Sequence, residues 1–264
     1  MRLLILSSSR YTTFDMNYIP IKTRIMQPPK DDFYKLLDDH LAKFKDGDIL
    51  CVTSKILAIH QGRCIKIEDS VDKKKLIMQE AERYMPRHKV AGHEFMLTIK
   101  EYTLIPSAGI DESNGDGYYI LWPKKPEKLA REIAEYVKKK NKLKRFAVII
   151  TDSHTTPLRR GVIGISTGFF GIKPFTSYVN KPDIFGRKLK FTTTNIVDVV
   201  AVQAVFLMGE GSECVSMVIA RNVPNIQFTN RDTYKHLIIK PEDDIYYPIL
   251  KNFKKKKPLK KWAA

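Results

Sequence analysis

Residues 145–153, RFAVIITDS, carry the clearest structural signal in this chain. This continuous apolar run ends at Asp152, and a run of this kind is typical of a central strand that is covered on both faces. The preceding residues, 125–144, show helical periodicity, with Pro126 in the first turn and a buried stripe formed by Leu129, Ile133, Tyr136 and Val137. The pair predicts an amphipathic helix that leads into a buried strand.

The remaining segments mix both kinds of element. Helical patterns occupy 31–44, 69–85 (with Asp69 or Ser70 as the expected N-cap) and the nearly all-apolar stretch 194–211, which predicts a buried helix ended by Gly209. Strand patterns occupy 47–59, 93–110 and 214–223. There is no internal repeat and no strict alternation of strand and helix. The sequence therefore predicts a mixed α/β fold.

The charge balance points to an anionic partner. The chain of 264 residues carries 46 Lys and Arg against 29 Asp and Glu, a formal net charge of +17. Part of this excess lies in the Lys-rich tail 251–264, which is most simply a solvated end, with a nucleic-acid tether as the alternative. Nucleic acid, a membrane surface or a phosphorylated small molecule would each match the charge.

The cysteines and the N-terminus indicate the compartment. Cys51, Cys64 and Cys214 are scattered without zinc-site spacing and are expected to be buried free thiols in a reducing environment. The start MRLLILSSSR has too few consecutive apolar residues for a signal peptide. No window of the chain approaches the 18 apolar residues that a membrane-spanning helix needs. We expect a cytoplasmic protein without a membrane segment.

Several common motifs are absent or fail in context. The chain has no P-loop, and the GEGSEC fragment at 209–214 follows a helix, unlike a dinucleotide fingerprint. An EF-hand starting at Asp111 would need Glu where Trp122 stands. The GISTG stretch 164–168 matches a hydrolase nucleophile motif through Ser166, with Asp183 and His236 in triad order. Gly171 and Pro174 follow too closely for the required helix, so a hydrolase is a minor alternative.

Carboxylates gather at the ends of apolar elements. Asp111 lies in the loop AGIDESNGDG (108–117), Asp152 ends the strongest strand and is followed by hydroxyl side chains, and Glu210 and Glu213 lie in the turn after 194–208. Oxygen ligands of this kind suit a hard cation such as Mg²⁺ or Mn²⁺, which could hold a triphosphate. The basic residues expected to meet its phosphates are Lys55, Arg159, Arg160 and Arg187. Ordinary turn and capping roles are the alternative for each carboxylate.

These residues resemble a known family. In order, the matching segments are IPIK (19–22), DGDILCVTSKILAIHQGR (46–63), AGIDESN (108–114), VIITDSHTTPLRRGVIGIS (148–166), DIFGRKL (183–189), the helix 195–208 and MGEGSECVSMVIAR (208–221). The chain is similar to the γ-glutamyl ligases of the deazaflavin coenzyme factor-420, as a divergent member. The resemblance implies a two-lobed mixed α/β fold that forms an intertwined homodimer.

It also implies an activity and its cofactors. Such a ligase uses GTP, or ATP, with two divalent ions (Mg²⁺ or Mn²⁺), and K⁺ is a further candidate ion. It joins L-glutamate to a carboxylate acceptor, a deazaflavin precursor or a folate-like molecule, through an acyl phosphate. By position, the metal-binding residues are Asp111, Asp152, Ser153 and Glu210, and the two aspartates are also catalytic. The nucleotide-contacting residues are Ile19, Pro20, Ile21, Lys22, Ser54, Lys55, Asn114, Met208, Gly209, Gly211, Ser212, Glu213, Cys214 and Val215.

The chain departs from the family pattern at two points. Ile59 stands where the family has a nucleotide-site Lys, and Thr155-Thr156 stands where it has Gly-Arg, so that Lys55 or His60 would have to compensate. We expect one unit over 1–250, with a possible sub-domain around 157–193. Two alternatives stay open: an inactive nucleotide-binding relative, and a basic nucleic-acid-binding protein, which lacks any motif that we can place.

Overall fold

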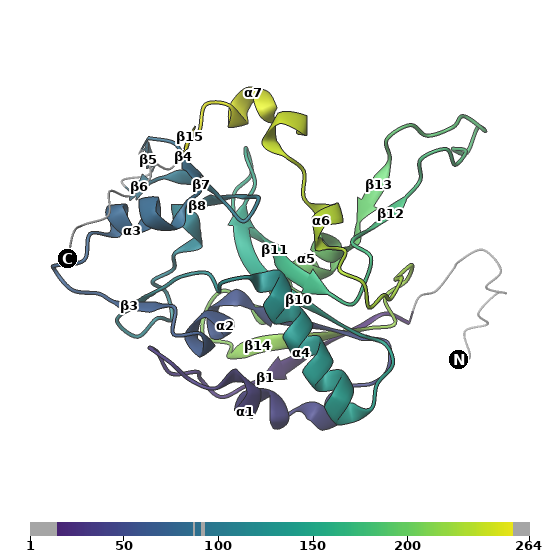
Figure 1. Cartoon of the computed structure of the whole chain (residues 1–264), viewed down its shortest axis with the longest axis horizontal. Helices are drawn as coiled ribbons and strands as arrows, with labels where there is room; N and C mark the ends of the chain where they lie inside the picture. The colour runs from purple at the N-terminus through teal and green to yellow at the C-terminus, as the bar shows by residue number, and fades with distance from the viewer. Residues whose placement is uncertain (1–14, 87, 91–92, 256–264) are drawn as a thin grey trace, which may run out of the picture.

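The structure is a computed structural model, and it describes residues 15–86, 88–90 and 93–255. Its main element is a five-stranded sheet (Figure 1). In spatial order the strands are β1 (Asn17–Lys22), β14 (Val215–Arg221), β2 (Asp48–Thr53), β10 (Phe146–Thr155) and β11 (Val162–Phe170). β2 and β10 are parallel, and every other neighbouring pair is antiparallel. The mixed α/β class predicted from the sequence is therefore confirmed.

Strand β10 has the role expected of residues 145–153. Phe146 to Thr151 are buried, because β10 pairs on both sides and helices cover both faces of the sheet. The strand continues to Thr155, beyond its expected end at Asp152, because it turns back into β11 as a hairpin. The register shifts between Ile150 and Thr151, which marks a β-bulge just before Asp152.

Helices form a layer on each face of this sheet. On one face α4 (Pro126–Asn141) packs with α1 (Phe33–Asp38) and α2 (Ser54–His60), and on the other face lies α5 (Ile196–Met208). Both α4 and α5 were predicted from the sequence. The prediction of a buried helix is correct for the face of α5 that packs on the sheet, but the outer face leaves Val199 53% exposed and Phe206 82% exposed.

Three sequence predictions needed correction at their boundaries. The strand expected over 47–59 ends at Thr53, and Ser54–His60 forms α2 instead. The reason is that both elements are buried, so the apolar run gives no periodicity that separates strand from helix. The helix expected over 31–44 is α1 followed by a 3₁₀ turn at Leu41–Lys43.

The helix expected over 69–85 is the shorter α3 (Lys73–Glu80), and its cap differs from the prediction. Asp72 provides the N-cap, accepting hydrogen bonds from the backbone N–H groups of Lys74 and Lys75. This cap replaces the expected Asp69 or Ser70 because its side-chain oxygen lies within reach of the free amides of the first turn.

A second, antiparallel sheet lies beside α3. In order its strands are β15 (Lys254–Lys255), β4 (Arg83–Tyr84), β7 (Leu97–Lys100) and β8 (Thr103–Pro106). Two short pairs accompany it: β3 (Cys64–Lys66) with β9 (Tyr118–Ile120), and β5 (His88–Val90) with β6 (His93–Phe95). The strand-like segments predicted over 93–110 are thus confirmed. Within the Lys-rich tail, Lys254 and Lys255 pair with β4, and residues 256–264 lie outside the described residues.

A two-stranded ribbon, β12 (Phe175–Ser177) with β13 (Thr193–Asn195), projects from the body of the molecule and carries residues 178–192 at its end (Figure 1). We call residues 175–195 the arm. The sub-domain expected around 157–193 includes this arm but also β11, which belongs to the main sheet; that domain boundary stays a prediction. The C-terminal part adds α6 (Tyr234–Leu237), the 3₁₀ turn Pro241–Asp243 and α7 (Tyr247–Leu250).

Two observations bear on the compartment predictions. Cys51, Cys64 and Cys214 are free thiols, as expected, but only Cys51 is buried, whereas Cys64 and Cys214 are partly exposed. Among the described segments, none of the helices combines the length and the apolar character that a membrane span requires.

Candidate active site

Several elements end at one edge of the main sheet. Because β2 and β10 are parallel, Thr53 and Thr151 to Ser153 lie at the same edge, where β14 also begins and β1 also ends. The carboxyl ends of parallel strands are the usual position of ligand sites in α/β proteins. A cavity of about 620 Å³ opens here, within the size range of small-molecule sites. Its lining residues fall within 24–28, 53–59, 111–116, 151–153 and 205–216.

Asp152 lies on the sheet side of this cavity. Its Oδ2 accepts hydrogen bonds from the indole N–H of Trp122 and from Ser54 Oγ (3.2 Å), and its Oδ1 accepts one from the backbone N–H of Ser153 (2.8 Å). Burial raises the pKa of the Asp152 carboxyl to about 6, against the effect of these hydrogen bonds. The negative charge of Asp111 also raises this pKa, so the two aspartates interact electrostatically.

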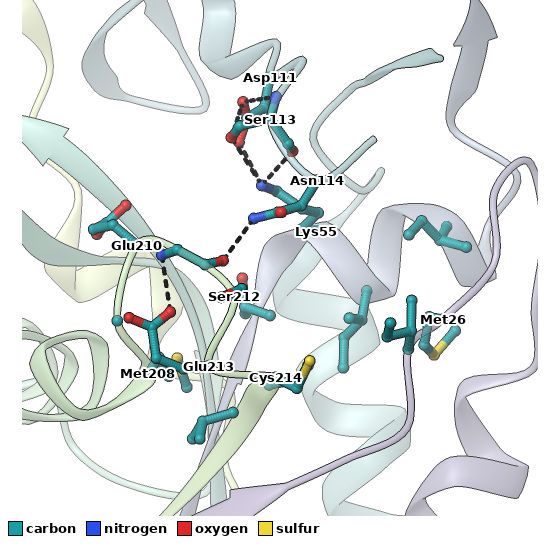
Figure 2. Close-up of a pocket in the computed structure, with 18 of the residues that line it drawn as sticks. Met26, Lys55, Asp111, Ser113, Asn114, Met208, Glu210, Ser212, Glu213 and Cys214 are labelled. Atoms are coloured by element: carbon teal, nitrogen blue, oxygen red, sulfur yellow. Dashed lines mark hydrogen bonds and ion pairs between the residues drawn. The ribbon is translucent and has the colours of Figure 1, made fainter. Parts of the chain in front are cut away.

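Asp111 lies on the opposite, loop side. Its Oδ1 accepts hydrogen bonds from the backbone N–H (2.9 Å) and the hydroxyl (2.8 Å) of Ser113, and its Oδ2 lies 2.6 Å from Lys55 Nζ (Figure 2). Burial opposes ionisation of Asp111, but the hydrogen bonds from Lys55 and Ser113 and the charge of Lys55 lower its pKa below the usual value. Asp111 is therefore a carboxylate that is already paired with the ammonium group of Lys55.

The backbone before Asp111 adopts an uncommon conformation. Ser107, Ala108 and Gly109 have φ values of 53°, 54° and 68°, so three consecutive residues are left-handed. Two of them are not glycine, and such backbone persists only where the surroundings hold it. The N–H of Ala108 donates to Thr98 Oγ1 (2.9 Å), and Asp111 exchanges two backbone hydrogen bonds with Ile120. These contacts fix the direction in which the loop enters the cavity.

Asn114 joins this loop to the turn after α5. Its Nδ2 donates to the backbone oxygen of Gly211 (2.9 Å), as Figure 2 shows. Within that turn the N–H of Gly211 donates to the carboxylate of Glu213 (2.8 Å). The two segments are 97 positions apart in sequence, and together they form one rim of the cavity.

Most of the site residues predicted from the sequence line this single cavity. They are Lys55, Asp111, Asn114, Asp152, Ser153, Met208, Gly209, Glu210, Gly211, Ser212, Glu213, Cys214 and Val215. Ser54 does not line the cavity, but its hydroxyl donates a hydrogen bond to Asp152, which does. Ile19, Pro20, Ile21 and Lys22 form β1 and do not line the cavity; the segment that follows them, 24–28, does.

The oxygen donors fit a divalent cation that is shared with a phosphorylated substrate. No group of three or more His, Cys, Asp or Glu side chains is close enough to hold a metal ion among the residues that the structure describes. Mg²⁺, however, is usually held by one or two carboxylates, with water and substrate phosphates completing the shell. Asp111, Asp152 and Ser153 line the same cavity, and their side-chain oxygens suit such an incomplete set.

The two departures from the family pattern have different surroundings. Ile59 is 2% exposed and belongs to an apolar wall of the cavity with Met26, Ile56 and Val205. Met26 lies away from the polar group around Asp111 (Figure 2). His60 is outside the cavity lining, where its Nδ1 accepts a hydrogen bond from the N–H of Phe33 (3.2 Å). Of the two residues expected to compensate for the missing Lys, only Lys55 lies in the cavity.

Other expected contacts lie elsewhere. Thr155 and Thr156 are outside the cavity lining, as are Arg159 and Arg160 in the β10–β11 turn and Arg187 in the arm. The basic residues that line this cavity are Lys55 and Arg24.

The hydrolase alternative is wrong in its geometry. Ser166 lies within strand β11, where it is 7% exposed and its hydroxyl donates to the backbone oxygen of Gly168 (3.5 Å). A nucleophile elbow needs a sharp turn between a strand and a helix, which this position lacks.

Trp122 is the site residue that sequence reasoning missed. In the sequence, Trp122 stands where an EF-hand would need Glu, and this position gives no sign that the indole contacts Asp152. The apolar wall formed by Met26, Ile56 and Ile59 was missed as well, because apolar residues in a buried run give no sign that they face a cavity.

The fold and the site together define an α/β protein with an acidic cavity at the carboxyl ends of parallel strands, the position at which enzymes of this architecture bind their substrates. The chain belongs to the F420-0:Gamma-glutamyl ligase family, whose model matches residues 20–222. The resemblance inferred from the sequence is confirmed.

Curated relatives agree with this assignment. A coenzyme F420:L-glutamate ligase of Methanopyrus kandleri is 28% identical over 89% of this chain and 98% of its own length. One of Archaeoglobus fulgidus is 30% identical over 73% of this chain and 82% of its own length. One of Methanococcus maripaludis is 37% identical over 59% of this chain, and that match spans 62% of the relative, less than two thirds.

Proposed function

We propose that this protein is a nucleotide- and divalent-metal-dependent ligase that forms an amide bond between L-glutamate and a carboxylate acceptor. One observation carries the proposal: Asp111 and Asp152, 41 positions apart, line the same cavity together with Lys55. The names of the relatives, coenzyme F420:L-glutamate ligase, indicate the amine substrate and the class of acceptor.

The chemistry requires activation of the acceptor carboxylate, because hydroxide is a poor leaving group. In the proposed first step an acceptor carboxylate oxygen attacks the γ-phosphorus of GTP or ATP, and the bond to the β-phosphate oxygen breaks. In the second step the amine of glutamate attacks the carbonyl carbon of the acyl phosphate, losing a proton, and inorganic phosphate leaves. The protein would contribute positioning and charge stabilisation rather than covalent chemistry.

The residues of the cavity divide naturally between these tasks. Asp111 and Asp152 would hold the cation, aided by Ser153 and Glu210, which line the same cavity. A divalent ion held by these residues would offset the negative charge of the phosphates. Lys55 would turn from Asp111 to a phosphate, since its ammonium group is on the cavity surface. Asn114 and residues 208–215 would hold the nucleotide. K⁺ remains part of the proposal without a residue assigned to it.

The apolar wall suggests where the uncharged part of a substrate would lie. Met26, Ile56 and Ile59 are almost fully buried and line the same cavity as the polar group around Asp111. An aromatic base or a ring of the acceptor would cover this wall, since ligand cavities combine an apolar lining with a few polar anchors. The choice of acceptor would then depend on Ile59, where the family pattern has a Lys.

The test uses the metal ligands directly. Purified protein is incubated with GTP or ATP, Mn²⁺, glutamate and candidate acceptors, and phosphate release and product mass are measured. We expect acceptor-dependent release with the mass gain of glutamate. Asp111→Asn and Asp152→Asn should each lower turnover by roughly a thousandfold, because the cation loses a charged ligand. Undiminished metal-dependent turnover in both variants would remove the proposal.

We also propose that the protein works as a homodimer. The helix α5 is apolar almost all round, and its outer face leaves Phe206 82% exposed. In the projecting arm Ile184, Phe185 and Phe191 are 91%, 88% and 88% exposed. Apolar patches of this kind mark interaction sites, and a second copy of the chain is the occupant implied by the family resemblance.

Sedimentation analysis tests the dimer. Phe206→Asp and Phe185→Asp should each weaken it, because a charge would be buried without a partner. Ile245→Asp is the matched control, since Ile245 is 86% exposed but lies near α7, outside the arm and α5. A wild-type protein that sediments as a monomer at all concentrations would contradict the dimer without affecting the ligase proposal.

An inactive nucleotide-binding relative is the second candidate. This candidate is favoured by Ile59, an uncharged aliphatic residue that lines the cavity at the position where the family pattern has a Lys. Binding of GTP without phosphate release across the panel of acceptors would identify it.

A further inference from the structure

Trp122 lies between the two parts of the candidate site. The residue follows β9 and is 3% exposed. The edge of its indole contacts Asp152, to which Nε1–H donates a hydrogen bond. Its ring lies against Gly109, because a Cβ added to Gly109 would collide with Nε1, Cε2 and Cδ1 of the indole. Gly109 is only two positions before Asp111. One side chain therefore touches both Asp152 and the turn that leads to Asp111.

Two basic residues hold Trp122 in place. The backbone oxygen of Trp122 accepts a hydrogen bond from Arg63 Nε (3.2 Å), and Lys100 Nζ lies 5.9 Å from the centre of its indole ring. Glu80 binds both cations, at 2.5 Å from Arg63 and 2.6 Å from Lys100. The network fixes Trp122 at its backbone and its ring, so little freedom remains for the N–H group that faces Asp152.

The hydrogen bonds of Asp152 divide its two oxygens. Oδ2 receives both Trp122 and Ser54, whereas Oδ1 receives the backbone N–H of Ser153. A carboxylate oxygen has about two acceptor directions, so Oδ1 retains one for another partner and Oδ2 retains none. In this arrangement Asp152 presents a single oxygen to the cavity.

We propose that Trp122 is a positioning residue that orients Asp152 so that Oδ1 faces a bound divalent cation, and that fixes the distance between Asp152 and the turn carrying Asp111. This inference rests on the proposed function, in which both aspartates hold the cation. Groups that hydrogen-bond to metal ligands commonly change metal affinity by roughly 10–100-fold when they are removed. The indole also acts through packing, because its ring lies against Gly109.

The first test measures Mn²⁺ binding without any turnover. Free Mn²⁺ is titrated by electron paramagnetic resonance against the wild-type protein and against Trp122→Phe, which keeps an aromatic ring and removes the N–H. We expect the variant to bind Mn²⁺ at least roughly tenfold more weakly. The matched control is Phe146→Leu. Phe146 is 1% exposed at the other end of β10, so this variant loses core packing while its Mn²⁺ affinity should match the wild type.

The second test keeps Trp122 in place. The chain has two tryptophans, so Trp262→Phe leaves Trp122 as the sole indole fluorophore. Mn²⁺ should change its emission with the same midpoint as the resonance titration, and Asp152→Asn should abolish that change. This measurement stands even if Trp122→Phe does not fold. An emission that stays constant at saturating Mn²⁺ would overturn the inference.

The outcomes separate the two proposals. If Asp111→Asn and Asp152→Asn lose Mn²⁺ while folded Trp122→Phe binds within twofold of wild type, the positioning role is overturned and the proposed function stands. If the wild-type protein binds no Mn²⁺ with or without GTP, both are overturned. Weaker binding by Trp122→Phe with normal binding by Phe146→Leu supports the inference.

Discussion

Asp152 and Asp111 reach the same cavity from opposite kinds of backbone. Asp152 belongs to the central strand β10, and burial raises the pKa of its carboxyl to about 6. Asp111 follows a turn of three left-handed residues, and its side chain is 43% exposed. The first carboxylate is fixed by the sheet, whereas the second depends on a loop that other residues hold.

The difference shows how a site can combine one rigidly held carboxylate with one that can move. A residue in a central strand cannot move without disturbing two neighbouring strands, because close-packed interiors transmit small shifts. Asp111 has one open side and a partner, Lys55, whose chain is flexible. We therefore expect Asp152 to set the position of the cation and Asp111 to adapt to it.

Lengthening each carboxylate by one methylene tests this directly. Asp152→Glu keeps the charge but forces an extra carbon between Trp122 and Ser54, and overpacked sites do not relax freely. We expect Mn²⁺ affinity to fall by about 100-fold in Asp152→Glu and only about tenfold in Asp111→Glu, a range typical of damaged metal sites. Titration by paramagnetic resonance measures both. Equal losses would show that the loop is as rigid as the strand.

The turn before Asp111 can be tested with two glycines of one loop. Gly109 (φ 68°) lies against Trp122, whereas Gly117 (φ 80°) has nothing within 4 Å of an added Cβ. Alanine at either position has the left-handed penalty of about 1 kcal/mol. At Gly109 the collision with the indole adds about 2 kcal/mol. Urea unfolding should thus separate Gly109→Ala from Gly117→Ala by about 2 kcal/mol, and indistinguishable midpoints would mean that Trp122 moves aside.

The sequence identified these two regions unequally, for physical reasons. Asp152 could be located because residues 146–150 form a short apolar run rich in β-branched residues, which is typical of a buried strand, and the helix 126–141 before it has one apolar stripe. Asp111 was found by composition and by family resemblance, since nothing in a Gly-rich loop predicts three left-handed residues. Both residues line one cavity, and their role as metal ligands stays a prediction.

What the sequence could not supply were the contacts between distant segments. Trp122 and Asp152 are 30 positions apart, and no periodicity relates a residue after one short strand to the end of another. The helix at Ser54–His60 was missed because burial on all sides removes the pattern that distinguishes helix from strand. Tertiary packing decided both, and an individual sequence segment does not encode it.

The support behind Trp122 should also contribute to stability. Glu80 pairs with Lys100, which is 6% exposed, and with Arg63. Glu80→Gln should lower the free energy of unfolding by about 1–2 kcal/mol at pH 7, between the values for exposed and buried pairs. Asp72→Asn, which keeps the cap of the same helix, is the control and should change stability little.

The pH dependence of that effect has a definite sign. Burial opposes ionisation of Glu80, but hydrogen bonds and charges from Lys100 and Arg63 lower its pKa below the usual value. A lowered folded-state pKa stabilises the protein above the ordinary carboxyl pKa, near 4.3, and this contribution disappears as the pH falls through the folded-state value. The difference between wild type and Glu80→Gln should therefore shrink below about pH 4. A constant difference across this range would exclude the ionised pair as its source.

The smallest expected effect concerns the partner that Asp111 has and Asp152 lacks. Lys55 Nζ lies 2.6 Å from Asp111 Oδ2 and donates to the backbone oxygen of Ser113 (2.9 Å), so a cation must compete with an ammonium group for the loop carboxylate. In the absence of nucleotide, Lys55→Met should therefore bind Mn²⁺ several-fold more tightly, a gain below 1.4 kcal/mol because the pair is partly exposed. With GTP present the order should reverse, since the variant lacks a cation for the phosphates. Lys73→Met is the matched control, because Lys73 pairs with Glu112 of the same loop and not with Asp111. Tighter Mn²⁺ binding in both variants would mean that the net charge of the loop matters, and not the contact with Asp111.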